Sequence, residues 1–384
     1  PKMSTRTIRK TGSSDARCGC SGVDTARQNP TVAGKEAGPC APAYVAAIAG
    51  AITAHTLSRM TYTPTVDGGP GQREYQEGAR VSKARLPLIG AVLLGGVLLA
   101  TAIPRGTARW TTVGKNRSFS ISGLALVRSR ADGVDLLIVH DNKGAKEPRL
   151  ATVAIGAGLR YTPLPWPTGR IPPADIESVT ALPHSYGQFL ISTSTGVVSV
   201  LAIQDGRVSV QGTFVLPDLP ATPMIEGLSV QSLDGVPIAA WGHRGGGAEP
   251  GRLYWGVFDA AGGTMTHVSQ IDVRVPYPMT GNPNTRHISD LRIAVDGRVW
   301  SLATNDPGER GPFESALYNL GVLRVTGNGV TFEPTRPLVP IQTFRRKVEA
   351  IELLDAGARM ALGTDDELAG GAIRIEALPI DAAP

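Results

Sequence analysis

Acidic side chains recur beside short apolar segments through the second part of this chain. Nine of them are candidates to converge at one end of a repeated fold: Asp141, Glu177, Glu226, Asp290, Asp306, Glu349, Asp365, Asp366 and Glu367. Hard cations such as calcium bind several carboxylate and carbonyl oxygens at once, and different segments can supply them. A cation held in this way could bind a phosphate or activate a water molecule. The pattern therefore predicts a candidate calcium site.

Basic and amide side chains lie near the same segment ends. Lys143, Arg244, Arg286 and Lys347 could neutralise an anionic ligand, because charge-assisted hydrogen bonds to anions are strong. We take four residues as candidate ligand-binding groups, namely Asn142, Lys143, Asn305 and Lys347. Two adjacent pairs are candidate catalytic acid/base or anion-binding groups, namely His243–Arg244 and Arg286–His287.

Other hydrolytic chemistries lack their motifs. No HExxH spacing occurs, so zinc hydrolysis has no support in the sequence. Ser192–Gly196 lacks the first glycine and the strand–turn–helix context of a nucleophile elbow.

A structural interpretation of the acids competes with the functional one. Acids before a strand often cap turns or accept hydrogen bonds from a neighbouring strand. We favour this bracing role for Glu177, Glu226 and Glu349. The ends of the second strands, above all Asp141–Asn142 and Asp365–Glu367, are where function is expected.

These candidate residues belong to a five-fold repeat. The copies are Ile121–Val127, Ile176–Leu182, Ile225–Val230, Ile288–Ala294 and Val348–Leu354. With Ser122, Glu177, Glu226, Asp290 and Glu349 as markers, the spacings are 55, 49, 64 and 59 residues. A period of this length built from strands predicts an all-β fold, a β-propeller with one blade per repeat.

The propeller is expected to have five blades, closed by the N-terminal strand. In the first repeat, apolar segments over 123–127, 135–139, 149–155 and 159–164 predict four strands. The last repeat is short of a fourth strand, whereas Trp110–Gly114 precedes the first blade and has no blade of its own. We expect this segment to complete the last blade and so cover an exposed edge. Six blades is the alternative, if Gly262–Met279 hides a degenerate one.

The repeats resemble the esterase-like phytase family of β-propellers and its relatives of unknown function. The phrases that carry the resemblance span residues 120–380 approximately: Ser122–Leu126 with Leu136–Asn142, Asp175–Val179 with Gln188–Ser194, Glu226–Val230, Ile288–Arg292, and Lys347–Ile351 with Met360–Glu367. The resemblance implies a secreted or periplasmic propeller with metal-assisted phosphoester or ester chemistry. The fold alone does not fix that function.

The sequence departs from this pattern in three places. Ser194 and Thr195 stand where other repeats carry acidic or Asn residues, and Ala350 replaces a glycine. Trp241–Arg244 stands where an Asp–Asn ending is expected. The predicted acidic ring is therefore incomplete.

The N-terminal third differs in composition from the repeats. Residues 1–102 contain 12 Lys and Arg against 6 Asp and Glu, which leaves 26 against 27 for residues 103–384. The repeats lack the basic surface of a nucleic-acid-binding protein, so we expect no nucleic-acid partner. All three cysteines, Cys18, Cys20 and Cys40, precede the repeats, which excludes thiolate chemistry from them.

Residues 81–102 have the layout of an export signal. Lys83 and Arg85 precede an uncharged apolar run from Leu86 to Leu99, and the small residues 100–102 follow. The alternative is an uncleaved anchor ending at Ile103, with membrane contact only through 86–103. Residues 1–80 are predicted to be disordered or a wrongly assigned upstream segment. Residues 103–384 form the predicted propeller domain, which either interpretation places outside the cytoplasm.

Two hypotheses follow. The first is an exported propeller that binds a small polar or anionic ligand at its channel mouth, as a calcium-assisted phosphoester or ester hydrolase. The alternative is a non-catalytic binding or scaffold propeller at the cell envelope.

Overall fold

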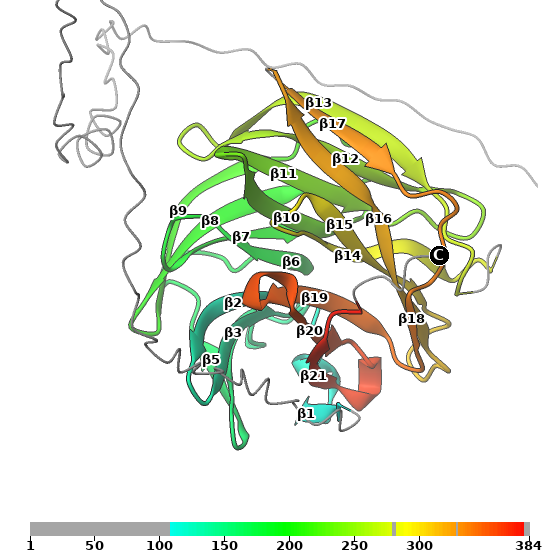
Figure 1. The fold of residues 1–384 in the computed structure, drawn as a ribbon. Helices are drawn as coiled ribbons and strands as arrows, with labels where there is room; N and C mark the ends of the chain where they lie inside the picture. The colour runs from blue at the N-terminus through cyan, green and yellow to red at the C-terminus, as the bar shows by residue number, and fades with distance from the viewer. Residues whose placement is uncertain (1–107, 279–281, 328, 380–384) are drawn as a thin grey trace, which may run out of the picture. The chain divides into compact units, whose positions relative to one another are not determined.

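The chain folds into a five-bladed β-propeller. The computed structural model describes residues 108–278, 282–327 and 329–379. They form five antiparallel sheets around a common centre, with one inner strand from each sheet nearest the axis (Figure 1). The predicted all-β propeller with five blades is confirmed.

The first three blades each contain four strands in chain order. Blade 1 contains β2 (Gly123–Arg130), β3 (Gly133–Val139), β4 (Leu150–Ile155) and β5 (Leu159–Leu164). Blade 2 contains β6 (Ile176–Ala181), β7 (Gln188–Thr193), β8 (Val197–Gln204) and β9 (Arg207–Val215). Blade 3 contains β10 (Ile225–Leu233), β11 (Val236–His243), β12 (Gly251–Asp259) and β13 (Thr264–Val273). The segment considered for a sixth blade thus supplies β13, the outer strand of blade 3.

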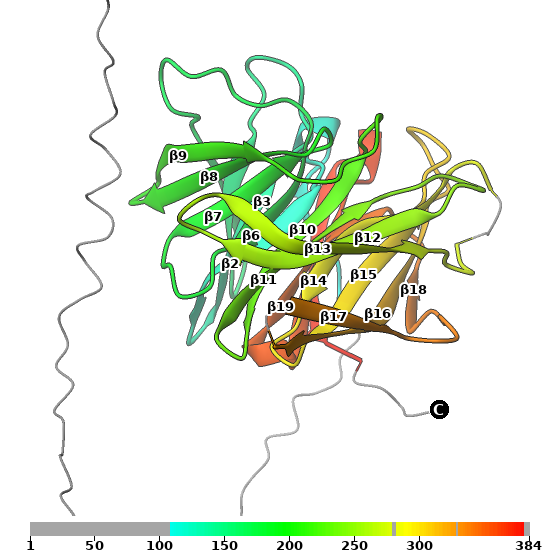
Figure 2. The same ribbon diagram turned by 90° about the horizontal axis from the view of Figure 1, so that it is seen from above.

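Blade 4 has a short extra strand. It contains β14 (Thr285–Ile293), β15 (Arg298–Asn305), β16 (Glu314–Thr326) and β17 (Gly329–Pro334). The long strand β16 also pairs at its beginning with β18 (Gln342–Phe344). Figure 2 shows blades 3 and 4 packed side by side.

Blade 5 is assembled from both ends of the described chain. It contains β19 (Val348–Leu354), β20 (Arg359–Thr364) and β21 (Gly371–Ala377). Its outer strand is β1 (Thr111–Gly114), which pairs with β21 and places Thr111 opposite Ile373. The predicted closure of the ring by the N-terminal strand is therefore observed. The described residues also contain three short 3-10 turns, η1 (Arg117–Phe119), η2 (Asp355–Gly357) and η3 (Glu367–Ala369).

The apolar core lies between neighbouring blades. Five buried clusters occur, and each joins side chains of two adjacent blades, including the pair formed by blades 5 and 1. On the face of blade 3 that packs against blade 2, for example, Trp241 of β11 stacks on Tyr254 of β12 with ring centroids 5.5 Å apart. Successive side chains of a strand point to opposite faces of its sheet, and each face packs against a neighbouring blade. The inner and second strands are therefore almost continuously apolar. Burial of these faces is the main force that holds the blades together.

The inner strands approach one another closely near the propeller axis. A Cβ atom added to Gly123 would lie 2.9 Å from the backbone nitrogen of Val179 in the next blade. A Cβ atom added to Gly227 would lie at the same distance from the nitrogen of Leu291. The residue at this position of each inner strand must therefore have a small side chain, or its side chain must form a hydrogen bond to the neighbouring strand.

Ser178 and Asp290 illustrate the second solution. The Ser178 hydroxyl accepts a hydrogen bond from the Leu228 N–H at 2.8 Å. The Asp290 carboxylate accepts from the N–H of Ile351 at 2.9 Å and from that of Leu291 at 2.8 Å. Asp290 was expected to match the acids at the strand starts, but Ser289 is the equivalent residue of β14. Asp290 stands one residue later and braces blade 4 against blade 5.

Arg292 fills the space where the inner strands converge. Its side chain is 3 % exposed and comes from β14. The guanidinium donates to the carbonyl oxygens of Leu124, Val179 and Leu228, which lie on β2, β6 and β10. It also meets Asp290 at 3.3 Å and the Glu352 carboxylate of β19 at 3.3 Å. One side chain therefore contacts the inner strands of all five blades.

Several predictions for the N-terminal third lie outside the described residues. These are the disordered or upstream segment 1–80, the signal peptide or anchor 81–102 and the three cysteines. Extracytoplasmic localisation stays a prediction for the same reason. Within the part of the chain that the structure describes, no helix has the length and hydropathy needed to cross a membrane.

Replacement of Arg292 by Met should strongly destabilise the ring. The change removes the donors of three buried carbonyls and leaves Asp290 and Glu352 without their cation. Removing one partner of a buried ion pair costs about 3–5 kcal/mol. The free energy of unfolding in urea measures the effect. Arg324→Met, at a site where the side chain is 62 % exposed, is the control and should change it by less than about 0.5 kcal/mol. Equal effects of the two changes would contradict the role of Arg292.

Candidate functional site

A polar cavity lies at the end of the propeller where the inner strands begin. Its volume is about 270 Å³. It is lined by Asp141, Lys143, Asp175, Glu177, Met224, Arg244, Arg286, Lys347, Glu349, Asp365 and Glu367. Residues of blades 1, 2, 3, 4 and 5 therefore meet there, as the repeat predicts for a channel mouth.

Beta-bulges position the three glutamates of the inner strands. In β6, β10 and β19 the pairing with the second strand skips one residue at Glu177, Glu226 and Glu349 respectively. A bulge bends the strand and re-aims the side chain of the extra residue. Glu177 and Glu349 line the cavity, and Glu226 lies against it through its ion pairs.

Two cations neutralise the side of the cavity formed by blades 3 to 5. Arg286 bonds Asp306 at 2.5 Å and Glu349 at 2.9 Å, and it lies 3.7 Å from Glu226. Arg244 pairs with Glu226 at 3.2 Å. Burial raises the pKa of Glu349 to about 8, although Lys347 and Arg286 act in the opposite direction.

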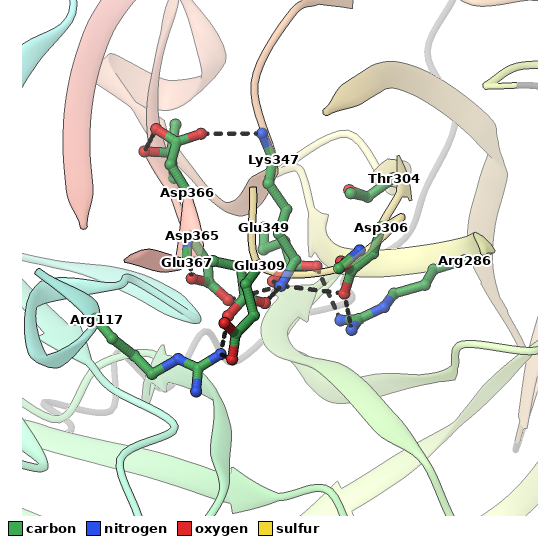
Figure 3. Close-up of polar contacts among 12 residues, drawn as sticks. Arg117, Arg286, Thr304, Asp306, Glu309, Lys347, Glu349, Asp365, Asp366 and Glu367 are labelled. Carbon is green, nitrogen blue, oxygen red and sulfur yellow. Dashed lines mark hydrogen bonds and ion pairs between the residues drawn. The ribbon is translucent and has the colours of Figure 1, made fainter. Parts of the chain in front are cut away.

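Lys347 is a third cation on this side of the cavity and the most enclosed of the three. Its ammonium lies 2.6 Å from Glu367, 2.7 Å from Asp365 and 3.3 Å from both Asp306 and Glu349 (Figure 3). Burial opposes ionisation of Asp365 and Asp306, but their pKa values are lowered because Lys347 stabilises the carboxylates. These acids are therefore ionised and already paired.

The side formed by blades 1 and 2 is different. Asp141 follows β3 and Glu177 lies in β6, and among the described residues neither carboxyl group forms an ion pair. Burial, with the negative charge of Asp365 next in weight, raises the pKa of Asp141 to about 6. Burial and the charges of Glu226 and Asp141 raise the pKa of Glu177 well above its usual value. Glu177 therefore holds its proton more firmly than an ordinary glutamate does.

Asp175 belongs to the rim of the cavity and was missed by the sequence analysis. It pairs with Lys143 at 2.8 Å and accepts a hydrogen bond from the Ser194 hydroxyl at 2.5 Å. These partners keep the pKa of Asp175 low against the effect of burial. Ser194, which stands where other repeats carry an acidic or Asn residue, thus has Asp175 as its partner. The position of Asp175, one residue before a β-strand, is a signal that the marker pattern did not include.

The predicted catalytic pairs are divided by the structure. Arg244 and Arg286 line the cavity, but both histidines are held by backbone groups. His287 accepts from the N–H of Val275 at 3.3 Å, so its other nitrogen donates to the Gly247 carbonyl at 3.1 Å. His243 accepts from the N–H of Gly245 at 3.2 Å. Burial lowers the pKa of both histidines, so they serve as neutral structural groups.

Three other candidates have structural partners or lie away from the cavity. Asn142 donates to the carbonyls of Ser118 and Pro148 at 3.1 and 2.8 Å. Asp366 contacts Arg346 and accepts from the Lys347 N–H at 3.2 Å. Asn305 is buried at the end of β15 and does not line the cavity. Of the candidate residues that follow or end the second strands, Asp141, Asp365 and Glu367 therefore line the cavity. Asn142, Asn305 and Asp366 do not line it.

The donor set does not fit the predicted calcium ion. In the described part of the chain, no group of three or more His, Cys, Asp or Glu side chains is arranged to hold a metal. The carboxylates expected to bind calcium surround Lys347 instead. Calcium therefore stays a prediction from the sequence, and no step below depends on it.

Comparisons with known proteins show similarity of fold only. No family model and no curated protein matches the chain. Among solved structures it is similar to a thermostable family-43 glycoside hydrolase, with 9% identity, 68% of this chain and 91% of the other covered, and a TM-score of 0.43. A GH43 endo-arabinanase from Bacillus licheniformis gives 11% identity, coverages of 71% and 98%, and a TM-score of 0.41.

A third similar structure is an alpha-L-arabinanase from Penicillium chrysogenum complexed with arabinobiose. Its identity is 9%, the coverages are 71% of this chain and 99% of the other, and the TM-score is 0.41. None of these comparisons shows the esterase-like phytase family, so that resemblance stays a prediction.

Asp365→Asn should lower the pKa of Asp141 below about 6. The change removes a negative charge that favours the protonated form of Asp141, and it leaves the positive charge of Lys347 less compensated. A carbon-detected NMR titration of the Asp carboxyl groups measures the shift. Asp234→Asn, in an exposed hairpin turn, is the control and should leave that pKa unchanged. A rise in the Asp141 pKa would show that the charges do not act across this cavity.

Proposed function

We propose that this protein is a hydrolase that uses Glu177 as a general acid and Asp141 as a general base. One observation carries the proposal. Glu177 and Asp141 are the cavity carboxyls without an ion pair among the described residues, and the pKa values of both are raised. Carboxyl groups held at different proton affinities in one site are the usual basis for dividing acid and base roles.

The two proton affinities assign the roles. At neutral pH, Asp141 is mostly ionised because its pKa is about 6, whereas burial and nearby negative charges raise the pKa of Glu177 well above its usual value and favour its protonated form. Glu177 can therefore protonate the oxygen of a leaving group as its bond to carbon breaks. Asp141 can accept the proton of the attacking water. Two carboxyl groups that flank a bond in this way are the standard machinery of glycoside hydrolysis.

The charge of the cavity favours an uncharged, hydroxyl-bearing substrate. Six acids and four basic residues line it, and most of them are already paired with one another. The volume of about 270 Å³ suits a group the size of one sugar ring. Paired carboxylates still have lone pairs free to accept hydrogen bonds from hydroxyl groups. A glycosidic bond to a neutral sugar is therefore the substrate class that we propose.

Binding of an anion without turnover is the second candidate, and Arg244 is the observation that favours it. Its side chain is 28 % exposed, and within the described residues Glu226 is the one partner found for its guanidinium. The remaining donors on this side chain could bind a phosphate or carboxylate. The calcium-assisted phosphoester or ester hydrolysis predicted from the sequence, and the alternative of a non-catalytic binding propeller, both need such a contact.

A panel of chromogenic substrates separates these functions. We expect turnover of at least one aryl glycoside of a neutral sugar, and none of aryl phosphates with or without calcium. Phosphate ester cleavage that requires calcium would reverse this assignment. If no substrate is turned over, but inorganic phosphate raises the melting temperature of the wild type and not that of Arg244→Met, anion binding replaces hydrolysis as the function.

Glu177→Gln should reduce the rate in a way that depends on the leaving group. With poor leaving groups, which need protonation, the loss should be about 10²–10⁴-fold. With dinitrophenyl glycosides, whose leaving group departs without a proton, the loss should be small. Steady-state kcat values on both substrate types measure the difference. Glu333→Gln, at a side chain that is 74 % exposed on β17, is the matched control. A uniform loss on both substrate types would remove the acid role of Glu177.

The pH profile should be bell-shaped. Activity should rise through pH of about 6 as Asp141 loses its proton, and fall at higher pH as Glu177 loses its own. Asp141→Asn should remove the acidic limb along with most of the rate, whereas Glu177→Gln should remove the alkaline limb. Rates measured from pH 4 to 10 at constant ionic strength test this. An acidic limb that persists in Asp141→Asn would assign it to another group.

A further inference from the structure

Lys347 is held rigidly at both its backbone and its side chain. It precedes β19 directly, and the residue is 1 % exposed. Its N–H donates to the Asp366 carboxylate at 3.2 Å, and its carbonyl accepts from the Asp365 N–H at 2.9 Å. The ammonium therefore has a fixed position in the wall of the cavity.

Four carboxylates converge on this ammonium. Asp365 and Glu367 lie at 2.7 and 2.6 Å, and Asp306 and Glu349 both at 3.3 Å (Figure 3). These acids come from the ends of β15 and β20, from the bulge of β19 and from η3. They are thus drawn from blades 4 and 5, as the ligands of a shared cation would be.

Further cations complete the neutralisation of this cluster. Arg286 shares Asp306 and Glu349 with Lys347, and Arg117 bonds Glu367 at 2.7 Å. Each of the four carboxylates around Lys347 thus has this ammonium as a partner, and three of them have a second cation. A divalent ion at the same point would lie against Lys347 and Arg286 and be repelled by both.

We infer that the ammonium of Lys347 is the built-in cation of this site, at the position predicted for calcium, and that it makes the carboxylate cluster independent of metal. Calcium takes six to eight oxygens at about 2.3–2.6 Å, and the lysine ammonium already occupies the point on which these four carboxylates converge. A tethered cation has a further property, because chelators cannot remove it. This inference concerns the cavity of the proposed hydrolysis, but its test needs no turnover.

Calcium binding by the wild-type protein is the first measurement. Isothermal titration with calcium chloride should show no saturable binding, and the melting temperature should be the same in EDTA and in millimolar calcium. Saturable binding together with a raised melting temperature would overturn the inference. This result is decisive whether or not any variant folds.

Lys347→Ala is the second measurement, because it leaves the four carboxylates and opens the space between them. We expect its melting temperature in EDTA to fall by about 5 °C or more, since buried acids lose their partner. Millimolar calcium should restore most of that loss, and magnesium much less, because Mg²⁺ demands stricter geometry. Lys143→Ala, at an exposed lysine that pairs with a single acid, is the control and should show no response to calcium.

The remaining outcomes are also decisive. If Lys347→Ala folds, loses stability and does not respond to calcium, the cluster is not a cation site and the inference fails. If the variant is recovered as folded protein only when it is purified in calcium, and unfolds when EDTA is added, the inference is supported. Activity of the wild type against glycosides enters none of these comparisons, so the proposed hydrolysis can fail separately.

Discussion

This propeller depends on one constraint, because backbone carbonyl oxygens of several inner strands converge near its axis. The hydrogen bonds donated by the Arg292 guanidinium satisfy these oxygens. Inner strands that lie this close together direct backbone carbonyls of several blades at one point. Buried carbonyls without donors are costly, and no apolar side chain could satisfy them. One planar guanidinium with five donors in a fixed geometry can serve several acceptors at once. The contacts of Arg292 with β2, β6, β10, β14 and β19 therefore link the five blades at a place where the apolar clusters between blades do not reach.

The same problem recurs nearer the mouth, where carboxylates take the place of carbonyls. Lys347, Arg286 and Arg244 neutralise the acids on the side of blades 3 to 5, and they do so unevenly around the ring. Asp141 of blade 1 and Glu177 of blade 2 are left without a paired cation. Ion pairs on one side and two unpaired carboxyl groups on the other are thus two results of one distribution of charge. The chemically useful groups are those that the bracing network does not include.

Much of the architecture can be predicted from the sequence, because it depends on local patterns. Apolar runs and their spacing give five blades, and the unmatched segment before the first repeat indicates the strand that closes the ring. The individual contacts at the axis cannot be predicted in this way. Asp290 looks like the other strand-start acids, yet a shift of one residue turns it toward Ile351. Arg292 is one of several polar residues in β14, and its own strand does not mark it as the residue that contacts all five blades.

Several of the predicted site residues line one cavity, but their ion pairs could not be predicted. Asp141, Glu177, Arg286 and Lys347 do meet at a channel mouth, as the repeat suggests. Which acid pairs with which base depends on bulges and on distances between blades, and the spacing of acids in the sequence does not show either. His243 and His287 show the same limit, because their roles follow from backbone groups that are distant in sequence.

The closing strand also has a consequence for the order of folding. Thr111 pairs with Ile373, 262 residues further along the chain (373 − 111). Blades 1 to 4 contain only strands that follow one another, so each can form as soon as its own segment exists. Blade 5 cannot form until its last strand is available, and until then the apolar faces of blades 1 and 4 that pack against it stay uncovered. Because contacts between distant residues close slowly, completion of the ring should be the latest step, and the cavity that spans blades 1 and 5 is assembled with it.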